Sequence, residues 1–398
     1  MFGSMRYLVV IAALLAGAGC GAETPGGHAG HGGSGGGGGS GGGQEPVPEI
    51  CGDRIDNDLD GADDFADSDC AVGPVLAAGL QGKLDEARGS EVGALALGIE
   101  TKGDRVATLA SGTVAVDGRA LLPGDRFPIG SITKSFVAVL VLQLRDEGKL
   151  ALSDPLSTWL PDFPRAERIT LHHLLSHTSG IAEYLQANTL NGWLLDHAEV
   201  TPAQMVELAA EQAPLFEPGT RWAYSNSNYV LLGLVIEAVT GTPVETELRA
   251  RIFEPLGMAD SFLQGEEEGS LEVHGYVPQT VGELDMIPYW NGTPAWTAGA
   301  IVSTTADMLR FSHGLFQGEL LTDTSLGEMI TPVGDAGSFR YGYGIIIGDG
   351  WIGHDGAVPG WMAQWIVTDE GNTIVTLQNR FDDADALARA TSGAIDQL

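Results

Sequence analysis

Positive charge is scarce in this chain of 398 residues. Twenty lysines and arginines face 53 aspartates and glutamates, so the formal net charge is −33. This balance argues against nucleic acid as a partner, because phosphates would be repelled, and against docking onto anionic lipid by charge. Beyond the N-terminus, the chain also lacks an apolar run long enough to span a bilayer. Only four lysines are present: Lys83, Lys102, Lys134 and Lys149.

Cysteine is almost as rare, with three residues. Residues 1–19 read as an export signal, with Arg6 before an apolar stretch and small residues at its end. Because Cys20 follows directly, the segment resembles a bacterial lipoprotein signal, which implies lipidation of Cys20 and a membrane-anchored protein of the cell envelope, facing the periplasm or the exterior. The alternative is ordinary secretion, with Cys20 removed or incidental. Cys51 and Cys70 then remain to form a disulfide in an oxidising compartment.

Two further segments precede the region of ordinary composition. Residues 20–49 are rich in glycine and serine and predict a flexible tether. Residues 50–72 are rich in aspartate, and their spacing resembles an EF-hand loop and the Asp-rich calcium repeats of secreted proteins. The ligands implied are Asp56, Asp58, Asp60, Asp64 and Asp67. We expect calcium there, since clustered carboxylates repel one another without a cation; the alternative is a solvated acidic spacer with two free thiols.

Residues 75–398 have the composition of one large folded domain. Their patterns predict a first helix, two early strands, three late strands and a closing helix. Between these segments, residues 151 to about 330 read as mostly helical. The five strands can form one antiparallel sheet flanked by helices, which is an α+β fold with a helical insertion. The predicted elements cover Val75–Arg88, Gly93–Glu100, Arg105–Thr113, Tyr341–Gly348, Trp361–Thr368, Thr373–Asn379 and Asp382–Gln397.

Ser131 and Lys134 lie at the start of the most apolar helical stretch, which continues through Val137–Leu144. Pro128 and Gly130 interrupt the preceding chain, so a helix is predicted to begin at Ser131. Residues three apart share a helix face, and partial desolvation would lower the pKa of the lysine. A neutral amine can then take the hydroxyl proton of Ser131 and make it a nucleophile. The alternative is that Ser131 caps the helix and Lys134 extends to the surface.

Tyr224 and Asn226 form a second candidate group, since a phenol can relay a proton and an amide can orient a carbonyl. They can equally anchor a loop and cap a helix. His354 and Gly356 form a third group, which lies in or just before a strand; there His354 would contact the tyrosine and serine, and Gly356 would let a substrate approach closely.

A fourth candidate is the pair His173 and His177, which could share a helix face and bind zinc. No third ligand is evident in the sequence. We therefore interpret both histidines as structural.

In this order and spacing, Ser131-Ile132-Thr133-Lys134, Tyr224-Ser225-Asn226 and His354-Asp355-Gly356 resemble the serine β-lactamase and penicillin-binding family. The similarity is to the branch of class C β-lactamases, D-Ala-D-Ala carboxypeptidases and related esterases. It implies the β-lactamase/transpeptidase-like fold and a Ser131 acyl-enzyme, with acid–base work shared by Lys134 and Tyr224 and no cofactor for the chemistry.

The resemblance also implies the substrate contacts. Asn226 would hold the substrate amide, and His354 would occupy the place of the third-motif lysine or histidine. The backbone N–H groups of Ser131 and Ala357 would form the oxyanion hole. The substrate would be an ester, a D-Ala peptide of peptidoglycan or a β-lactam.

Two departures from the family's pattern bear on that substrate. His354 stands where most β-lactamases carry lysine, so a cation for a substrate carboxylate is weakened or made pH-dependent. Asp355 stands where many members carry threonine and would repel an anion. We therefore expect poor β-lactam hydrolysis. The alternative function is a binding or sensor protein that holds penicillins or cell-wall peptides without turnover.

Overall fold

The computed structural model describes residues 70–89, 93–103, 105–279, 282–337, 339–381 and 384–398. The predicted signal, the lipidation site Cys20 and the tether lie outside them. Cys51 and the five predicted calcium ligands also lie outside them. The predicted Cys51–Cys70 pairing therefore falls outside the described residues as well.

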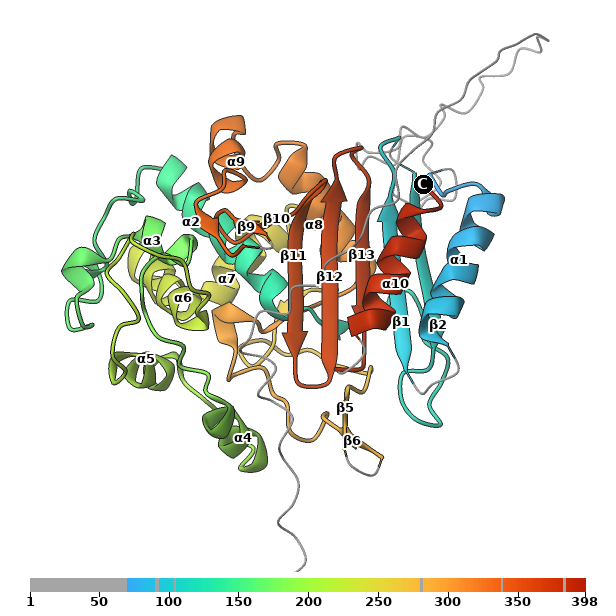
Figure 1. The fold of residues 1–398 in the computed structure, drawn as a ribbon, viewed down its shortest axis with the longest axis horizontal. Helices are drawn as coiled ribbons and strands as arrows, with labels where there is room; N and C mark the ends of the chain where they lie inside the picture. The colour runs from blue at the N-terminus through green and yellow to red at the C-terminus, as the bar shows by residue number, and fades with distance from the viewer. Residues whose placement is uncertain (1–69, 90–92, 104, 280–281, 338, 382–383) are drawn as a thin grey trace, which may run out of the picture.

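One antiparallel sheet extends from the middle of the molecule to its right-hand side in Figure 1. Within the described residues it has eight strands, in the order β2-β1-β13-β12-β11-β10-β9-β8. The five long strands are β1 (Ala94–Glu100), β2 (Val106–Gly112), β11 (Trp351–Val358), β12 (Trp361–Thr368) and β13 (Thr373–Gln378). Four of them confirm predicted strands to within a few residues, whereas β11 was not among the five strands predicted.

The predicted count of five strands was wrong, because β11 was not counted and three very short strands extend the sheet beyond it. The run Tyr341–Gly348, predicted as one strand, forms two of them around a turn at Gly344, whose φ is +66°. Only a glycine adopts this conformation readily, so the run cannot continue as one strand. The short strands are β8 (Gly334–Asp335), β9 (Arg340–Tyr341) and β10 (Ile346–Ile347).

The sheet is buried on both faces because helices cover both. Along β1, Leu95 and Leu97 pack with α1 (Pro74–Arg88) and α10 (Ala384–Ile395), which lie side by side on one face (Figure 1). Ala94 and Ala96 belong to the larger core on the other face. This alternation follows from the two-residue period of a strand.

The helix α2 (Thr133–Asp146) lies at the centre of the larger core. Almost all of its side chains are buried, and Phe136 stacks on Phe311 of α8 (Thr305–Phe316) with ring centroids 3.7 Å apart. Burial of this kind is the main source of stability for such a helix. Figure 1 shows the long strands on one side of α2 and α3, α5 and α6 on the other.

The helical region, predicted for residues 151 to about 330, is confirmed in outline. It contains α3 (Leu171–Leu175), α4 (Ala187–Leu195), α5 (Pro202–Ala210), α6 (Asn226–Thr240), α7 (Val244–Leu248) and α9 (Asp323–Met329), besides α8. Short strands interrupt it: β4 (Phe262–Leu263) and β7 (Ile301–Ser303) pair with β3 (Phe127–Pro128), and β5 (Tyr276–Pro278) pairs with β6 (Glu283–Asp285). Among the described residues, no single helix is long and apolar enough to cross a membrane; α6 and the helix after it pass that test only together, bent by 82°.

Candidate active site

Ser131 lies in a tight turn between β3 and α2. The turn, Gly130–Ile132, is a single 3-10 turn, and α2 begins only at Thr133, two residues later than predicted. Gly130 has a φ of +54°, and a Cβ there would lie 2.4 Å from the amide nitrogen of Ala357. The turn therefore requires glycine for its conformation and for its close packing on β11. Ser131 is not a helix cap, since neither segment has a side-chain cap.

Lys134 is fully buried, so the alternative of a surface lysine was wrong. Its Nζ lies 2.9 Å from Ser131 Oγ, 2.7 Å from Asn226 Oδ1 and 2.6 Å from the carbonyl oxygen of Ala298. Burial lowers the pKa of Lys134 to about 7, and the negative charge of Glu183 opposes part of this shift. A large fraction of the amine is therefore neutral near pH 7.

The neighbours of Lys134 determine where its lone pair points. A neutral amine has two N–H groups and one lone pair. The oxygens of Asn226 and Ala298 are carbonyl oxygens, which only accept, so they take the two N–H groups. The lone pair is left for Ser131, whose hydroxyl can donate to it across the 2.9 Å contact. The site thus holds the serine proton facing a base.

Tyr224 is a second polar neighbour of Ser131. Its hydroxyl donates to Ser131 Oγ at 2.8 Å, and Lys134 Nζ lies 4.9 Å from the centre of its ring. Burial raises the pKa of Tyr224 well above its usual value, and the nearby charges of Glu183 and Asp355 add to this. The phenol therefore stays protonated and serves as a donor.

Asn226 is the first residue of α6, and its side chain makes no cap for that helix. Glu183 fixes its orientation: one carboxylate oxygen accepts from the backbone N–H of Asn226 at 2.7 Å and from its side-chain amide at 3.0 Å. The amide oxygen must then face Lys134. Glu183 was not among the predicted site residues, although it follows the candidate pair His173 and His177 closely in the chain.

The third motif lies within β11, beside the Ser131 turn. A Cβ on Gly356 would lie 1.8 Å from the carbonyl oxygen of Ile129 and 3.2 Å from the backbone nitrogen of Ser131. The prediction that Gly356 leaves room for a substrate was wrong, because this space is filled by the Ser131 turn. The same packing brings the backbone of Ala357 next to that turn.

His354 is buried and reaches Tyr224 only indirectly. Its Nδ1 donates to the carbonyl oxygen of Asp355 at 2.6 Å, so its Nε2 accepts from the hydroxyl of Tyr341 at 2.9 Å. The Tyr341 ring in turn lies edge-on to that of Tyr224. Burial, together with the charge of Lys134, lowers the pKa of His354 to about 3. His354 is therefore neutral, which agrees with the expectation of a weakened cation and not with the alternative of a cation that depends on pH near neutrality.

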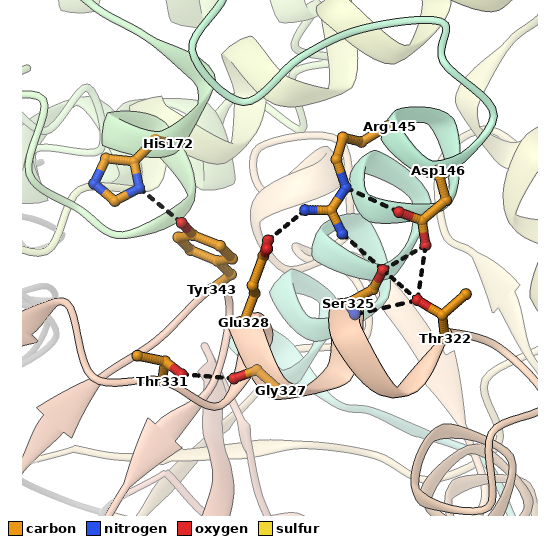
Figure 2. A network of polar contacts seen from close by, with 9 residues as sticks. All are labelled: Arg145, Asp146, His172, Thr322, Ser325, Gly327, Glu328, Thr331 and Tyr343. Carbon is orange, nitrogen blue, oxygen red and sulfur yellow. Dashed lines mark hydrogen bonds and ion pairs between the residues drawn. The ribbon is translucent and has the colours of Figure 1, made fainter.

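A polar network ties α9 to the end of α2 (Figure 2). Arg145 donates to Ser325 at 2.7 Å and also pairs with Glu328, and Ser325 donates to Asp146. Ser325 and Glu328 both lie on α9. The network therefore fixes α9 on the helix that carries Lys134.

The end of α9 in turn holds the turn between β9 and β10. The carbonyl oxygen of Met329 accepts from the backbone N–H of Tyr343 at 2.9 Å, and the Tyr343 hydroxyl bonds His172 Nδ1 at 2.7 Å (Figure 2). Ser135 on α2 donates to the carbonyl oxygen of Gly344 at 2.6 Å. These bonds position Tyr341 against His354.

His173 and His177 do not share a helix face. His173 lies in α3 and accepts from the backbone N–H of Thr170 in a capping box, whereas His177 follows the helix and is buried. Within the described residues, no group of three or more histidine, cysteine, aspartate or glutamate side chains could hold a metal ion. The two histidines therefore do not form the pair that a shared zinc site would need.

A serine hydroxyl held between a buried amine and a protonated phenol is the arrangement of a site that forms covalent acyl intermediates. Comparison with known proteins agrees with this class. The profile of the Beta-lactamase family matches residues 84–397. The chain belongs to this family, and the expected α+β fold is confirmed.

Two curated relatives are 34% identical to the chain. One is a putative penicillin-binding protein, PbpX of Bacillus subtilis, over 257 residues, which are 64% of this chain and 62% of that protein. The other is esterase EstB of Burkholderia gladioli, over 234 residues, or 53% of this chain and 58% of that protein. The chain thus matches somewhat under two thirds of the length of these relatives.

Among solved structures, the D-amino acid amidase of Ochrobactrum anthropi in complex with D-phenylalanine is similar with a TM-score of 0.75 and 26% identity, covering 81% of this chain and 99% of that one. A D-stereospecific amidohydrolase from Streptomyces is 31% identical with a TM-score of 0.68, covering 79% of this chain and 98% of that one.

Proposed function

We propose that this protein is a serine hydrolase that cleaves an ester or amide through an acyl-enzyme on Ser131. The observation that carries the proposal is the position of the serine hydroxyl, 2.9 Å from the buried amine of Lys134 and 2.8 Å from the hydroxyl of Tyr224. The family membership and the esterase and amidase names among its relatives support it.

In the first step, the Lys134 amine takes the proton of Ser131 as its oxygen attacks the substrate carbonyl. The backbone N–H groups of Ser131 and Ala357, which the packing of Gly130 on β11 brings close, would bind the developing oxyanion. Tyr224 stays protonated and can give its proton to the leaving group, then recover one from Lys134. Water releases the acyl group in the reverse sequence.

Asn226 would orient the carbonyl side of the substrate, using the second N–H of an amide that Glu183 already fixes. His354 acts from behind Tyr341 and is neutral, so it supplies no charge for a substrate carboxylate. Together with the carboxylate of Asp355, this favours uncharged or cationic substrates over anionic ones.

The test is Ser131→Ala against wild type. We expect the variant to lose turnover of p-nitrophenyl butyrate and labelling by a fluorophosphonate probe, with an unchanged circular dichroism spectrum. If the wild-type protein is labelled at Ser131 but does not turn over the ester, this would support the second candidate, a protein that binds such ligands without releasing them. Turnover that survives in Ser131→Ala would refute the proposal.

For location, we propose an exported lipoprotein anchored through Cys20, supported by the leader sequence alone. Intact-mass measurement of protein from the membrane fraction tests it. An unmodified, soluble N-terminus would refute the anchor.

We also propose that the aspartate-rich segment binds calcium. Calorimetric titration of the mature chain tests this idea, with Asp56→Asn/Asp58→Asn as the control. Equal heats in both proteins would refute it.

A further inference from the structure

His177 has a strained backbone in a buried place. It follows α3, its side chain is fully buried, and its φ is +57°. A residue other than glycine is uncommon in this left-handed region, and the surroundings must hold it there. The function proposed above assigns His177 nothing to do.

His177 forms hydrogen bonds with the residues on both sides of Tyr224 in the chain. Its carbonyl oxygen accepts from the backbone N–H of Ala223 at 3.1 Å, and its Nδ1 accepts from the backbone N–H of Ser225 at 3.3 Å. One residue thus holds the chain on both sides of the tyrosine. Its ring also lies against that of Tyr224, with centroids 4.3 Å apart.

The same contacts fix the proton of the His177 ring. A backbone N–H can only donate, so Nδ1 must carry a lone pair. The side-chain amide of Asn228 donates to Nδ1 as well, at 3.0 Å, and its oxygen is held by Ser179 at 2.6 Å. The neutral ring therefore carries its hydrogen on Nε2. A protonated ring would lose both acceptor bonds, and burial keeps the pKa of His177 well below its usual value.

His177 Nε2 is buried and has no hydrogen-bond partner among the described residues. The rings of Tyr341 and Tyr229 surround the imidazole, with centroids 4.9 and 5.3 Å away, beside that of Tyr224. A lone N–H among ring faces finds only weak acceptors. Such a site is costly for stability, and a plain framework position has no need of it.

We propose that His177 is a positioning residue for the reaction: its neutral ring and its carbonyl hold Tyr224 at hydrogen-bond distance from Ser131. The inference rests on the proposed function, because it assigns His177 a role only through the proton that Tyr224 delivers. His177 itself touches neither substrate nor Ser131.

Two variants separate the contacts of His177. His177→Phe keeps a ring beside Tyr224 but removes the acceptor for Ser225 and Asn228. His177→Asn removes half of the ring, offers its Oδ1 in the place of Nδ1, and suits the left-handed backbone. Two substrates with one acyl group report on proton delivery: phenyl butyrate, whose leaving group needs a proton, and p-nitrophenyl butyrate, whose leaving group needs it less.

We expect His177→Phe to lower the rate constant of acylation, measured in single turnovers with enzyme in excess, about 100-fold for phenyl butyrate and about tenfold for p-nitrophenyl butyrate, with KM within about twofold of wild type. His177→Asn should recover most of the loss. Equal losses on the two esters, a change confined to KM, or equal impairment in both variants would overturn the proposal. Should His177→Phe fail to fold, as judged by circular dichroism, His177→Gln replaces it, since its amide also lacks an acceptor at Nδ1.

A double-mutant cycle decides whether His177 acts through Tyr224. When His177→Phe is added to the Tyr224→Phe variant, it should reduce the rate constant of acylation by p-nitrophenyl butyrate by less than about twofold. A framework role predicts the same tenfold loss in both backgrounds and would overturn the inference. Loss of turnover in Ser131→Ala is established first, so that failure of the proposed function is recognised separately.

Discussion

Gly344 lies directly against Lys134: a Cβ on the glycine would be 2.7 Å from the lysine's carbonyl oxygen. The contact joins the turn between β9 and β10 to the first turn of α2. Gly344 also has a φ of +66°, so both its conformation and its space exclude a side chain. The position of Lys134 thus depends on a residue in the turn between β9 and β10.

We expect Gly344→Ala to lower the free energy of unfolding by about 2–4 kcal/mol, since a left-handed alanine is strained and the added methyl overpacks the turn. Gly350→Ala is the matched control: its φ is +82°, but a Cβ there meets nothing within 4 Å. It should cost about 1–2 kcal/mol, for the strain alone. Urea unfolding gives both values, and equal losses would contradict the steric argument.

Activity should separate the same two variants. Because Gly344→Ala pushes on the backbone of Lys134, we expect kcat for p-nitrophenyl butyrate to fall about tenfold or more. Gly350→Ala should leave kcat unchanged.

The pH profile should report the state of Lys134. Its pKa is lowered to about 7 by burial, and only the neutral amine accepts the serine proton. We therefore expect kcat/KM to fall below about pH 7 with a slope of one. The charge of Glu183 raises the pKa of Lys134, so Glu183→Gln should lower that pKa and move the acidic limb to lower pH. A limb that stays in place or moves upward would contradict this assignment.

Much of the fold was readable from the sequence because the long strands have strong patterns. The burial alternation along β1, with Leu95 facing one core and Ala96 the other, follows directly from strand geometry. The short strands β8 to β10 carry no such pattern. They exist because the turn at Gly344 packs on α2, and this contact joins residues far apart in the chain.

The site divides in the same way. Ser131 and Lys134 were predictable because one helical turn joins them, and Tyr224 and Asn226 because of a resemblance in order and spacing. Glu183 and Tyr341 were missed, since only tertiary packing brings them to Asn226 and His354. The tautomer of His354 was equally hidden, because it depends on a neighbouring carbonyl.

Asp307 should give the protein a pH-dependent stability. Burial raises the pKa of this carboxyl to about 6, although Ser261, Arg310 and the backbone N–H of Asp260 stabilise its charge. Because the pKa of Asp307 is higher in the folded protein than in the unfolded chain, its protonated form stabilises the fold. This contribution to the free energy of unfolding is complete below the unfolded pKa of about 4 and is lost as the pH rises through 6. It amounts to at most about 3 kcal/mol.

Asp307→Asn, which cannot titrate, should therefore gain stability relative to wild type by up to about 3 kcal/mol between pH 4 and pH 7. Asp125→Asn is the control, because the pKa of Asp125 is lowered and its stabilising charge is already present above pH 4. Its difference from wild type should stay constant between pH 5 and 7. Urea unfolding across this range measures both, and parallel curves for Asp307→Asn would contradict the prediction.

Asp355 should set the preference against anionic substrates. It lies between His354 and Gly356 on β11, its charge acts on Tyr224, and its carboxylate accepts from the amide of Gln364 at 3.0 Å. Nitrocefin, a β-lactam, carries a carboxylate, whereas p-nitrophenyl butyrate does not. We expect wild type to hydrolyse the ester much faster than nitrocefin, because no cation at His354 offsets the carboxylate of Asp355.

Asp355→Thr should raise kcat/KM for nitrocefin about tenfold, because it removes one like charge at close range. The kcat/KM for p-nitrophenyl butyrate should change by less than about twofold. Burial also raises the pKa of Asp355, so acidification of the wild-type enzyme should favour nitrocefin relative to the ester, whereas Asp355→Thr should show no such trend. The ratio of the two rates cancels the common loss from protonation of Lys134. A ratio that is the same in both proteins at every pH would exclude Asp355 as the source of selectivity.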